Sequence, residues 1–220
     1  MRVVVDHISK SFKGTPVLKD ISLSASGGEV VGFEGINGSG KTMLMRAICG
    51  LIRVDSGVVT ADGQKIGRDV DAPRNLGILI EEPAFLGAYT GFQNLKMLAY
   101  LRGPCSDEEL RRTLSRVGLD PYDKRKYKSY SLGMCQRLGL AAAIMQEPEL
   151  IVLDEPTNAL DADGVEMAVR IVREERDRGA LVIIACHDRE NMRLMSDVVY
   201  TMEDGRIANC EEVRHEAPDH

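Results

Sequence analysis

The stretch that decides the fold is Gly35-Ile36-Asn37-Gly38-Ser39-Gly40-Lys41-Thr42, which matches the pattern G-x-x-x-x-G-K-[ST]. An apolar strand over 30–33 precedes it and an amphipathic helix follows it, which is the context of a phosphate-binding loop. The glycines let the backbone curl, so that successive N–H groups and the helix N-terminus point at phosphate oxygens. We expect Lys41 to reach the β- and γ-phosphates of a nucleotide and the Thr42 hydroxyl to meet Mg²⁺. The alternative is a glycine-rich turn with an incidental lysine.

A second stretch carries the matching acidic groups. It reads Leu150-Ile151-Val152-Leu153-Asp154-Glu155-Pro156, an apolar strand that ends in two carboxylates. Beside a phosphate loop, a carboxylate at a buried strand end can hold Mg²⁺, usually through water, and we predict this role for Asp154. Glu155 faces the other way and is predicted to be the general base for a water in line with the γ-phosphate. Taken alone, this pair could also be a solvated strand end.

Working outward, the rest of the chain alternates strands and helices around a helical stretch. Strands are predicted over 2–6, 17–25, 29–34, 57–61, 76–80, 150–153, 180–185, 198–202 and 206–209. Helices are predicted over 41–51, 163–178 and 189–195, and after the capping box Ser106-Asp107-Glu108-Glu109. Continuous apolar strands between helices predict a buried, mainly parallel sheet. We therefore predict a single α/β domain with a P-loop NTPase core and an N-terminal antiparallel β subdomain (1–84 and 146–220). A helical subdomain is inserted over 85–145.

The composition of the chain excludes several classes of function. The net charge is −6, aromatic residues are 5% and Trp is absent, so we expect no nucleic acid partner. The five cysteines are odd in number and scattered, which fits neither a disulfide framework nor a zinc ribbon. No signal peptide and no run of about 18 apolar residues is found, so any membrane span must come from another chain. The charged run over 170–178 is expected to be a solvated helix face.

Between the two phosphate-site stretches lies Tyr130-Ser131-Leu132-Gly133-Met134-Cys135-Gln136-Arg137-Leu138, which resembles the signature motif of the ABC ATPases, usually written LSGGQ. Asn158-Ala159-Leu160-Asp161 looks like the D-loop of that family, and His187 looks like its switch histidine. The resemblance covers the chain from about residue 2 to 209 and implies the ABC ATPase fold.

The resemblance implies a head-to-tail dimer with two ATP molecules and Mg²⁺ at the interface. Ser131 and Gly133 would then contact the γ-phosphate of the ATP bound to the other subunit, whereas His187 would contact the γ-phosphate in its own subunit. Asp161 would link the two sites. Phe12 aligns with the aromatic residue that stacks on adenine, although it could instead be a core residue of the β subdomain.

Two departures from the family pattern point to a subgroup. Leu132 and Met134 replace the usual Gly and Gln of the signature, and Glu81 stands where the Q-loop normally has Gln. Both departures are similar to those of the bacterial ATPases that export bacitracin-type and lantibiotic-type peptides. A carboxylate at position 81 could still hold Mg²⁺ or water.

The resemblance therefore implies an Mg²⁺-dependent ATPase that powers transport, most simply export of a peptide, drug or lipid-like molecule. The expected partners are a separate transmembrane permease subunit and a second copy of the chain. The expected location is cytoplasmic, peripheral at the inner face of the cell membrane. Two alternatives stay open: a non-transport ABC ATPase such as an iron–sulfur assembly ATPase, and an ATP-binding module with little turnover.

Overall fold

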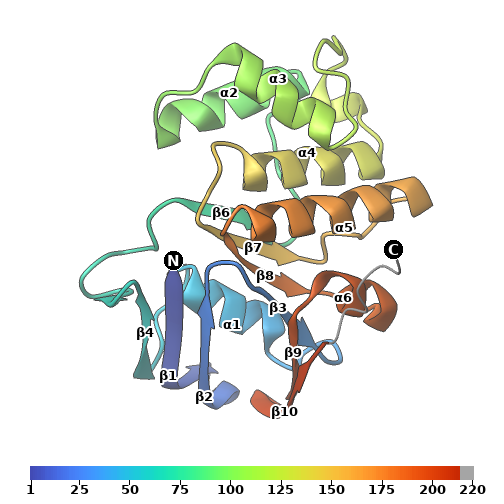
Figure 1. The fold of residues 1–220 in the computed structure, drawn as a ribbon. Coiled ribbons are helices and arrows are strands. Elements are labelled where there is room, and N and C mark those ends of the chain that lie inside the picture. The colour runs from blue at the N-terminus through green and yellow to red at the C-terminus, as the bar shows by residue number, and fades with distance from the viewer. Residues whose placement is uncertain (214–220) are drawn as a thin grey trace.

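Two β-sheets organise the chain, and the computed structural model describes residues 1–213 (Figure 1). An antiparallel sheet has the strand order β2 (Thr15–Ser26), β1 (Arg2–Phe12), β4 (Ser56–Ala61), β5 (Gln64–Lys65). A six-stranded sheet has the order β10 (Arg206–Glu212), β9 (Val198–Glu203), β3 (Val30–Glu34), β8 (Leu181–Ala185), β7 (Leu150–Asp154), β6 (Leu76–Leu79). From β9 to β6 all neighbours are parallel, and β10 alone pairs antiparallel. These sheets match the predicted fold class.

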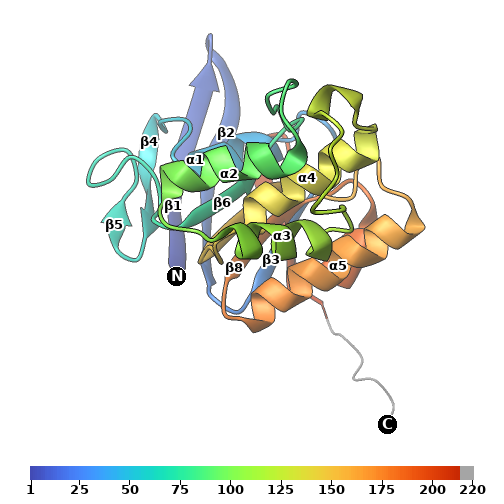
Figure 2. The same cartoon turned by 90° about the horizontal axis from the view of Figure 1, so that it is seen from above.

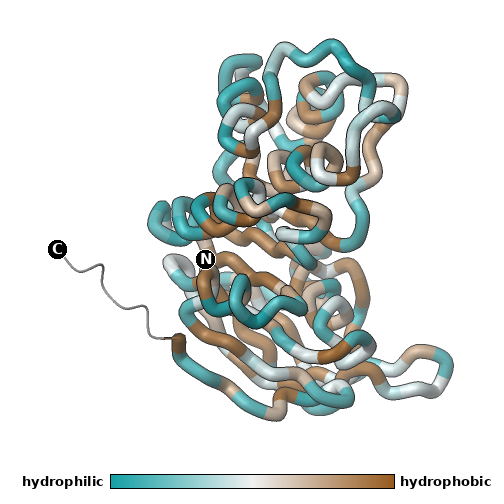
Figure 3. The backbone as a smooth tube through the Cα atoms, turned by 90° about the vertical axis from the view of Figure 1, so that its right-hand side faces the viewer, coloured by the Kyte–Doolittle hydropathy of each residue, from teal (hydrophilic) through white to brown (hydrophobic). Residues whose placement is uncertain are grey.

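The central strands of the six-stranded sheet, β3, β8 and β7, are buried on both faces, which explains their unbroken apolar runs. Side chains alternate between two cores: Ile151 and Leu153 face one, whereas Leu150 and Val152 face the other. Helix α1 (Lys41–Ile48) lies in the second core, between the two sheets, and contacts β2, β4 and β8. Figure 3 shows the same division, with hydrophobic residues concentrated in the inner strands and hydrophilic ones along the outer turns.

On the other face of this sheet lie α4 (Leu132–Ile144), α5 (Ala162–Asp177) and α6 (Arg189–Met195). Helix α4 approaches β6 very closely, since a Cβ added to Gly77 would lie 1.8 Å from the carbonyl oxygen of Ala143. Only a residue without a side chain can stand at that point of the strand. The signature helix is thereby held directly over the edge of the sheet.

Helices α2 (Gly91–Arg102) and α3 (Asp107–Arg116), with the short 3₁₀ turn Tyr127–Ser129, complete the helical stretch and lie above α4 (Figure 2). The predicted capping box of α3 is confirmed, with Ser106 and Glu109 bonding each other's backbone. A second capping box at the start of α2, made by Thr90 and Gln93, was not predicted. Both boxes fix where the helices begin.

Two predicted element ends are wrong for identifiable reasons, and one short strand was missed. Strand β1 runs on past Asp6 to Phe12, because His7 has φ 48° and forms a bulge that hides the alternation. Helix α1 ends at Ile48 instead of 51, because Gly50 has φ 76° and the chain turns there. The two-residue strand β5 was missed.

The charged run over 170–178 is not the fully solvated face that was expected. Glu175 is only 2% exposed and pairs with Arg116 of α3 and with Arg178. A buried carboxylate between two guanidinium groups ties the helical stretch to the core, so this part of the prediction is corrected.

Within residues 1–213 no helix is long and apolar enough to cross a membrane. The five cysteines are free thiols. Cys186 is buried, and burial raises its pKa, as expected for an unreactive core thiol. Residues 214–220 of the predicted core segment lie outside the described residues.

Candidate functional site

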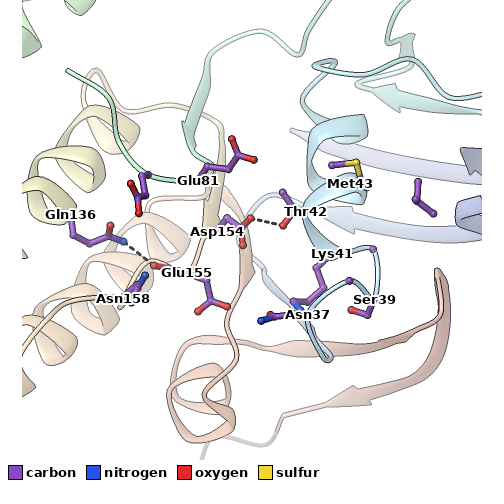
Figure 4. A pocket seen from close by; sticks show the side chains of 14 residues that line it. Asn37, Ser39, Lys41, Thr42, Met43, Glu81, Gln136, Asp154, Glu155 and Asn158 are labelled. Carbon is purple, nitrogen blue, oxygen red and sulfur yellow. Dashed lines mark hydrogen bonds between the residues drawn. The ribbon is translucent and has the colours of Figure 1, made fainter. Parts of the chain in front are cut away.

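The carboxyl ends of four parallel strands meet at one edge of the sheet and carry most of the predicted site. The phosphate loop follows β3, Glu81 follows β6, Asp154 and Glu155 end β7, and His187 follows β8. In an open α/β sheet this edge is where ligands bind. A cavity of about 520 Å³ lies there (Figure 4). It is lined by Val17, Asn37, Gly38, Ser39, Gly40, Lys41, Thr42, Met43, Glu81, Glu82, Gln136, Asp154, Glu155 and Asn158.

The phosphate loop has the backbone that its glycines predict. Gly38 and Gly40 have φ 83° and 107°, values that residues with a side chain rarely adopt. Lys41 is buried, and its ammonium donates to the carbonyl oxygens of Gly35 at 2.6 Å and Ile36 at 3.2 Å. The hydroxyl of Ser39 is buried without a hydrogen-bond partner. A phosphate in the cavity would give the Ser39 hydroxyl the acceptor it lacks and the third N–H of the Lys41 ammonium a further one.

Gly35 and Ile36 start this loop but do not line the cavity themselves. A Cβ on Gly35 would lie 2.4 Å from the carbonyl oxygen of Met202, so this glycine is needed where the loop passes β9. Ile36 is exposed at the tip of the loop. Their contribution is the shape of the loop and the two carbonyl oxygens that hold Lys41.

Thr42 and Asp154, both predicted to hold Mg²⁺, lie together, and the threonine hydroxyl donates to the Asp154 carboxylate at 2.7 Å (Figure 4). Burial raises the pKa of Asp154, and the neighbouring Glu155 charge adds to that shift, although the Thr42 hydrogen bond opposes it. A desolvated carboxylate beside a hydroxyl is a hard-oxygen donor set that fits Mg²⁺. Among residues 1–213 no cluster of three or more His, Cys, Asp or Glu forms a complete metal cage, so phosphate and water would have to supply the other ligands.

Glu155 sits on a strained backbone with φ 52°. Its N–H donates to the carbonyl oxygen of Ala185 at 2.8 Å, and its carboxylate lies 2.7 Å from Nδ1 of His187. The structure therefore brings the predicted base and the predicted switch histidine into direct contact. Asp154 points toward Thr42, whereas the Glu155 carboxylate is directed away from Thr42 (Figure 4). The partner of Glu155 is His187 instead.

Glu81 also has a left-handed backbone, with φ 63°, and lines the cavity beside Glu82. Its carboxylate forms an ion pair with Arg46 from the last turn of α1. The guanidinium offsets part of the negative charge that a glutamate adds to a site already holding Asp154 and Glu155.

The remaining predicted residues do not line this cavity. Ser131 caps α4 by accepting a hydrogen bond from the N–H of Met134, and Gly133 lies beside Ala159. Asp161 caps α5 and pairs with Arg137. Phe12 is exposed at the end of β1, with the Lys10 ammonium 5.4 Å from its ring centroid. Their predicted nucleotide contacts thus stay predictions.

The chain is similar to known proteins over nearly its whole length. The family model described as ABC transporter matches residues 18–158. An uncharacterized ABC transporter ATP-binding protein of Bacillus subtilis, YybJ, is 39% identical over 96% of this chain and 97% of its own length. This chain belongs to the ABC transporter family.

More distant relatives bear out the subgroup resemblance. The bacitracin transport ATP-binding protein BcrA of Enterococcus faecalis is 35% identical over 93% of this chain and 67% of its own length. The lantibiotic transport ATP-binding protein SrtF of Streptococcus pyogenes is 31% identical over 92% and 87%. Among solved structures, the ATP-binding cassette MJ0796 has a TM-score of 0.88 at 24% identity, covering 97% of this chain and all of that one. This last similarity confirms the fold.

Some lining residues of this ABC transporter family site were missed in the sequence. Gln136 belongs to the signature stretch and Asn158 to the D-loop, but the sequence predicted no role for either. Both lie beside Glu155 in the structure. A glutamine on a helix and an asparagine in a turn carry no local signal, and only the packing of α4 against the end of β7 reveals them.

Proposed function

We propose that this chain hydrolyses ATP with Mg²⁺ and thereby powers transport through a separate membrane subunit. One observation carries the proposal: Lys41, Thr42, Asp154 and Glu155 come from segments more than 100 residues apart and line a single cavity at the N-terminus of α1. Membership in the ABC transporter family supports the coupling to transport.

The proposed chemistry assigns each group a separate task. The N–H groups of the phosphate loop and Lys41 would bind and orient the phosphates, and the N-terminus of α1 would favour their charge. Thr42 and Asp154 would hold Mg²⁺, which when bound neutralises phosphate charge. Glu155 would accept the proton of the attacking water, and His187, within hydrogen-bond distance of that carboxylate, would orient it and meet the γ-phosphate.

A second copy of the chain is proposed to complete each site. Ser131 and Leu132 are exposed at the start of α4, away from the cavity of their own chain. In a head-to-tail dimer, Ser131 and Gly133 would cap the nucleotide of the other subunit with the N-terminus of α4. The related cassette MJ0796, solved as a dimer with ADP and phosphate, gives a precedent in another protein.

The membrane subunit is proposed to dock on the helical subdomain, residues 85–145. A groove of about 320 Å³ lies between the segment after β6 and helices α2 and α4, with Pro83, Phe85 and Leu98 among its lining residues. Leu86, Tyr89, Tyr100 and Leu101 are exposed apolar side chains on the neighbouring loop and helix. Exposed apolar groups around a groove are typical of a binding surface. Through this contact the chain would sit at the inner face of the cell membrane.

The class of substrate is proposed from the relatives alone. BcrA and SrtF are bacitracin and lantibiotic transport proteins, respectively. We propose export of a peptide, drug or lipid-like molecule, selected by the membrane subunit.

Replacing the proposed base tests the hydrolysis step. The Glu155→Gln variant should keep ATP binding, accumulate an ATP-bound dimer and lose at least about 100-fold in turnover, because the water loses its proton acceptor. Phosphate release and gel filtration with ATP measure these effects. Glu149→Gln, at the exposed opposite end of the same strand, is the matched control and should behave like wild type. Equal turnover of both variants would exclude Glu155 as the base.

A pull-down from detergent-solubilised native membranes tests the transport part. The tagged Glu155→Gln chain with ATP should recover a polytopic membrane protein. Adding Leu86→Asp should reduce that recovery about tenfold, because a charge would enter the apolar contact. Adding Leu51→Asp, at an exposed leucine near the end of α1, should leave it unchanged. Recovery of water-soluble partners only would move the proposal to a non-transport ATPase.

A further inference from the structure

The backbone of Glu155 is held by a side chain from the signature helix. Nε2 of Gln136, in the second turn of α4, donates to the carbonyl oxygen of Glu155 at 2.8 Å (Figure 4). Gln136 is only 8% exposed, and it lines the same cavity as Glu155. The two residues are 19 positions apart in the sequence. Burying an amide costs desolvation energy that a leucine in the same space would not, so the hydrogen bond that compensates this cost is a specific contact.

The contact matters because Glu155 occupies an unfavourable backbone conformation. A non-glycine residue at φ 52° persists only where its surroundings fix it. The N–H of Glu155 is held by Ala185, and its carbonyl oxygen accepts a second hydrogen bond from the N–H of Asn158 at 3.1 Å, within the same turn. Gln136 supplies the other hydrogen bond to the Glu155 carbonyl oxygen, and it does so from helix α4. It therefore decides where the turn sits relative to α4.

Helix α4 also begins with Ser131, the residue proposed to contact the nucleotide of the other subunit. Ser131 and Gln136 are five residues apart, about 7.5 Å along the helix axis. Helix α4 packs against β6 and β7, and Gly77 lets its backbone approach the sheet closely. We therefore expect the helix to move as one rigid unit. A displacement of the Ser131 end would thus be carried to the Glu155 carbonyl.

We propose that Gln136 is a positioning residue for ATP hydrolysis, which holds the turn at Glu155 in its reactive place and links it to the signature end of helix α4. This inference rests on the proposed function of Glu155. The side chain of Gln136 does not touch the reacting atoms; it acts through the main chain of the base.

The variant Gln136→Met removes the donor at similar volume and tests this role. It should lower kcat about 10- to 100-fold, because a small misplacement of the base is costly, while ATP affinity stays within about twofold. The matched control is Gln146→Met, which removes a glutamine donor to the carbonyl oxygens of Gly103 and Pro104, outside the cavity. The control should keep both kcat and ATP affinity.

The variant Gln136→Glu distinguishes a role of the hydrogen bond to Glu155 from a role of the side-chain volume alone. When ionised, its carboxylate repels the Glu155 carbonyl oxygen, but when protonated it donates a hydrogen bond in place of the amide. Its turnover relative to wild type should therefore rise as pH falls from 8 to 6, while the ratio for Gln136→Met stays flat. A flat ratio for Gln136→Glu, at the level of Gln136→Met, would overturn the inference.

Hydrogen exchange gives a readout that needs no turnover. The backbone amides of Glu155, Thr157 and Asn158 should exchange about fivefold faster in Gln136→Met than in wild type and in Gln146→Met, as the loss of one hydrogen bond predicts. Unchanged exchange or an unchanged kcat would overturn the inference. If wild type itself shows no hydrolysis, the proposed function fails, and exchange over 155–158 still decides whether Gln136 holds this turn.

Discussion

At the scale of single residues, the ionised Asp154 carboxylate lowers the stability of the folded chain when no ligand is bound. Burial raises its pKa, which means that the folded state holds its proton more tightly than the unfolded state does. The stability of the folded chain therefore decreases as pH rises from the ordinary aspartate pKa through the raised one, and stays lower above it. Such a penalty is typical of a group that exists to bind a cation.

Removing the charge should release this penalty. We expect Asp154→Asn to raise the melting temperature of the nucleotide-free chain at pH 7 by about 2 °C, a modest effect because the group is partly exposed. The asparagine oxygen can still accept from Thr42. The gain should shrink as pH falls through the raised pKa of Asp154, because the wild-type carboxyl also becomes neutral there. Thermal unfolding at several pH values measures it.

The same variant should lose the stabilisation that Mg²⁺ with ATP gives to wild type, because one of the two proposed metal ligands has lost its charge. Asp71→Asn removes an exposed carboxylate far from the cavity and serves as the control. It should change neither the melting temperature nor its response to Mg²⁺ and ATP. A drop in melting temperature for Asp154→Asn at pH 7 would contradict the assignment of Asp154 as a destabilising, ligand-binding group.

At the scale of elements, helices α3 and α5 are joined by an ion-pair cluster with one deeply buried member. Arg116 of α3 donates to Glu174 at 2.9 Å and to Glu175 at 2.8 Å. Glu174 is 47% exposed whereas Glu175 is 2% exposed, although both belong to one charged run. Removing a partner from a buried pair leaves an uncompensated charge, and this is far more costly than losing an exposed pair.

We therefore expect two adjacent substitutions to differ strongly. Glu175→Ala should lower the free energy of unfolding by about 3 kcal/mol, whereas Glu174→Ala should lower it by about 0.5 kcal/mol. Urea unfolding of the two variants measures the difference, and each variant is the control for the other. Equal, small effects would mean that Arg116 and Arg178 are solvated without Glu175 and that the cluster does not hold the two helices together.

Local patterns explain how much of these elements the sequence could predict. Apolar runs such as Leu150–Asp154 and the capping box at Ser106 act within a few residues, so strands of the parallel sheet and the start of α3 were predicted correctly. Glu175 and Gln136 obtain their roles from partners on distant segments, and their own surroundings in the sequence look like ordinary helix. The ion pair of Glu81 with Arg46 was hidden for the same reason.

At the scale of the whole molecule, the residues of the proposed composite site fall into two groups within the described chain. The cavity with Lys41 lies at the strand ends, whereas the exposed Ser131 caps α4 and does not line that cavity. An isologous dimer that joins these two groups contains two equivalent sites, each built from both chains. The resemblance to the ABC ATPases implied this division between two chains, and it stays a prediction.

Mixing two defective chains tests that arrangement. Lys41→Ala removes the phosphate-binding cation, while Ser131→Asp keeps a good helix cap but places a carboxylate against the γ-phosphate of the partner's nucleotide. Each variant alone should be inactive. A mixed dimer has one site with both defects and one intact site, made by Lys41 of one chain and Ser131 of the other. With random pairing, an equal mixture should recover about a quarter of wild-type phosphate release. If purified mixed dimers, selected by two different tags, hydrolyse no faster than either parent, Ser131 does not act across the interface and the head-to-tail arrangement is wrong.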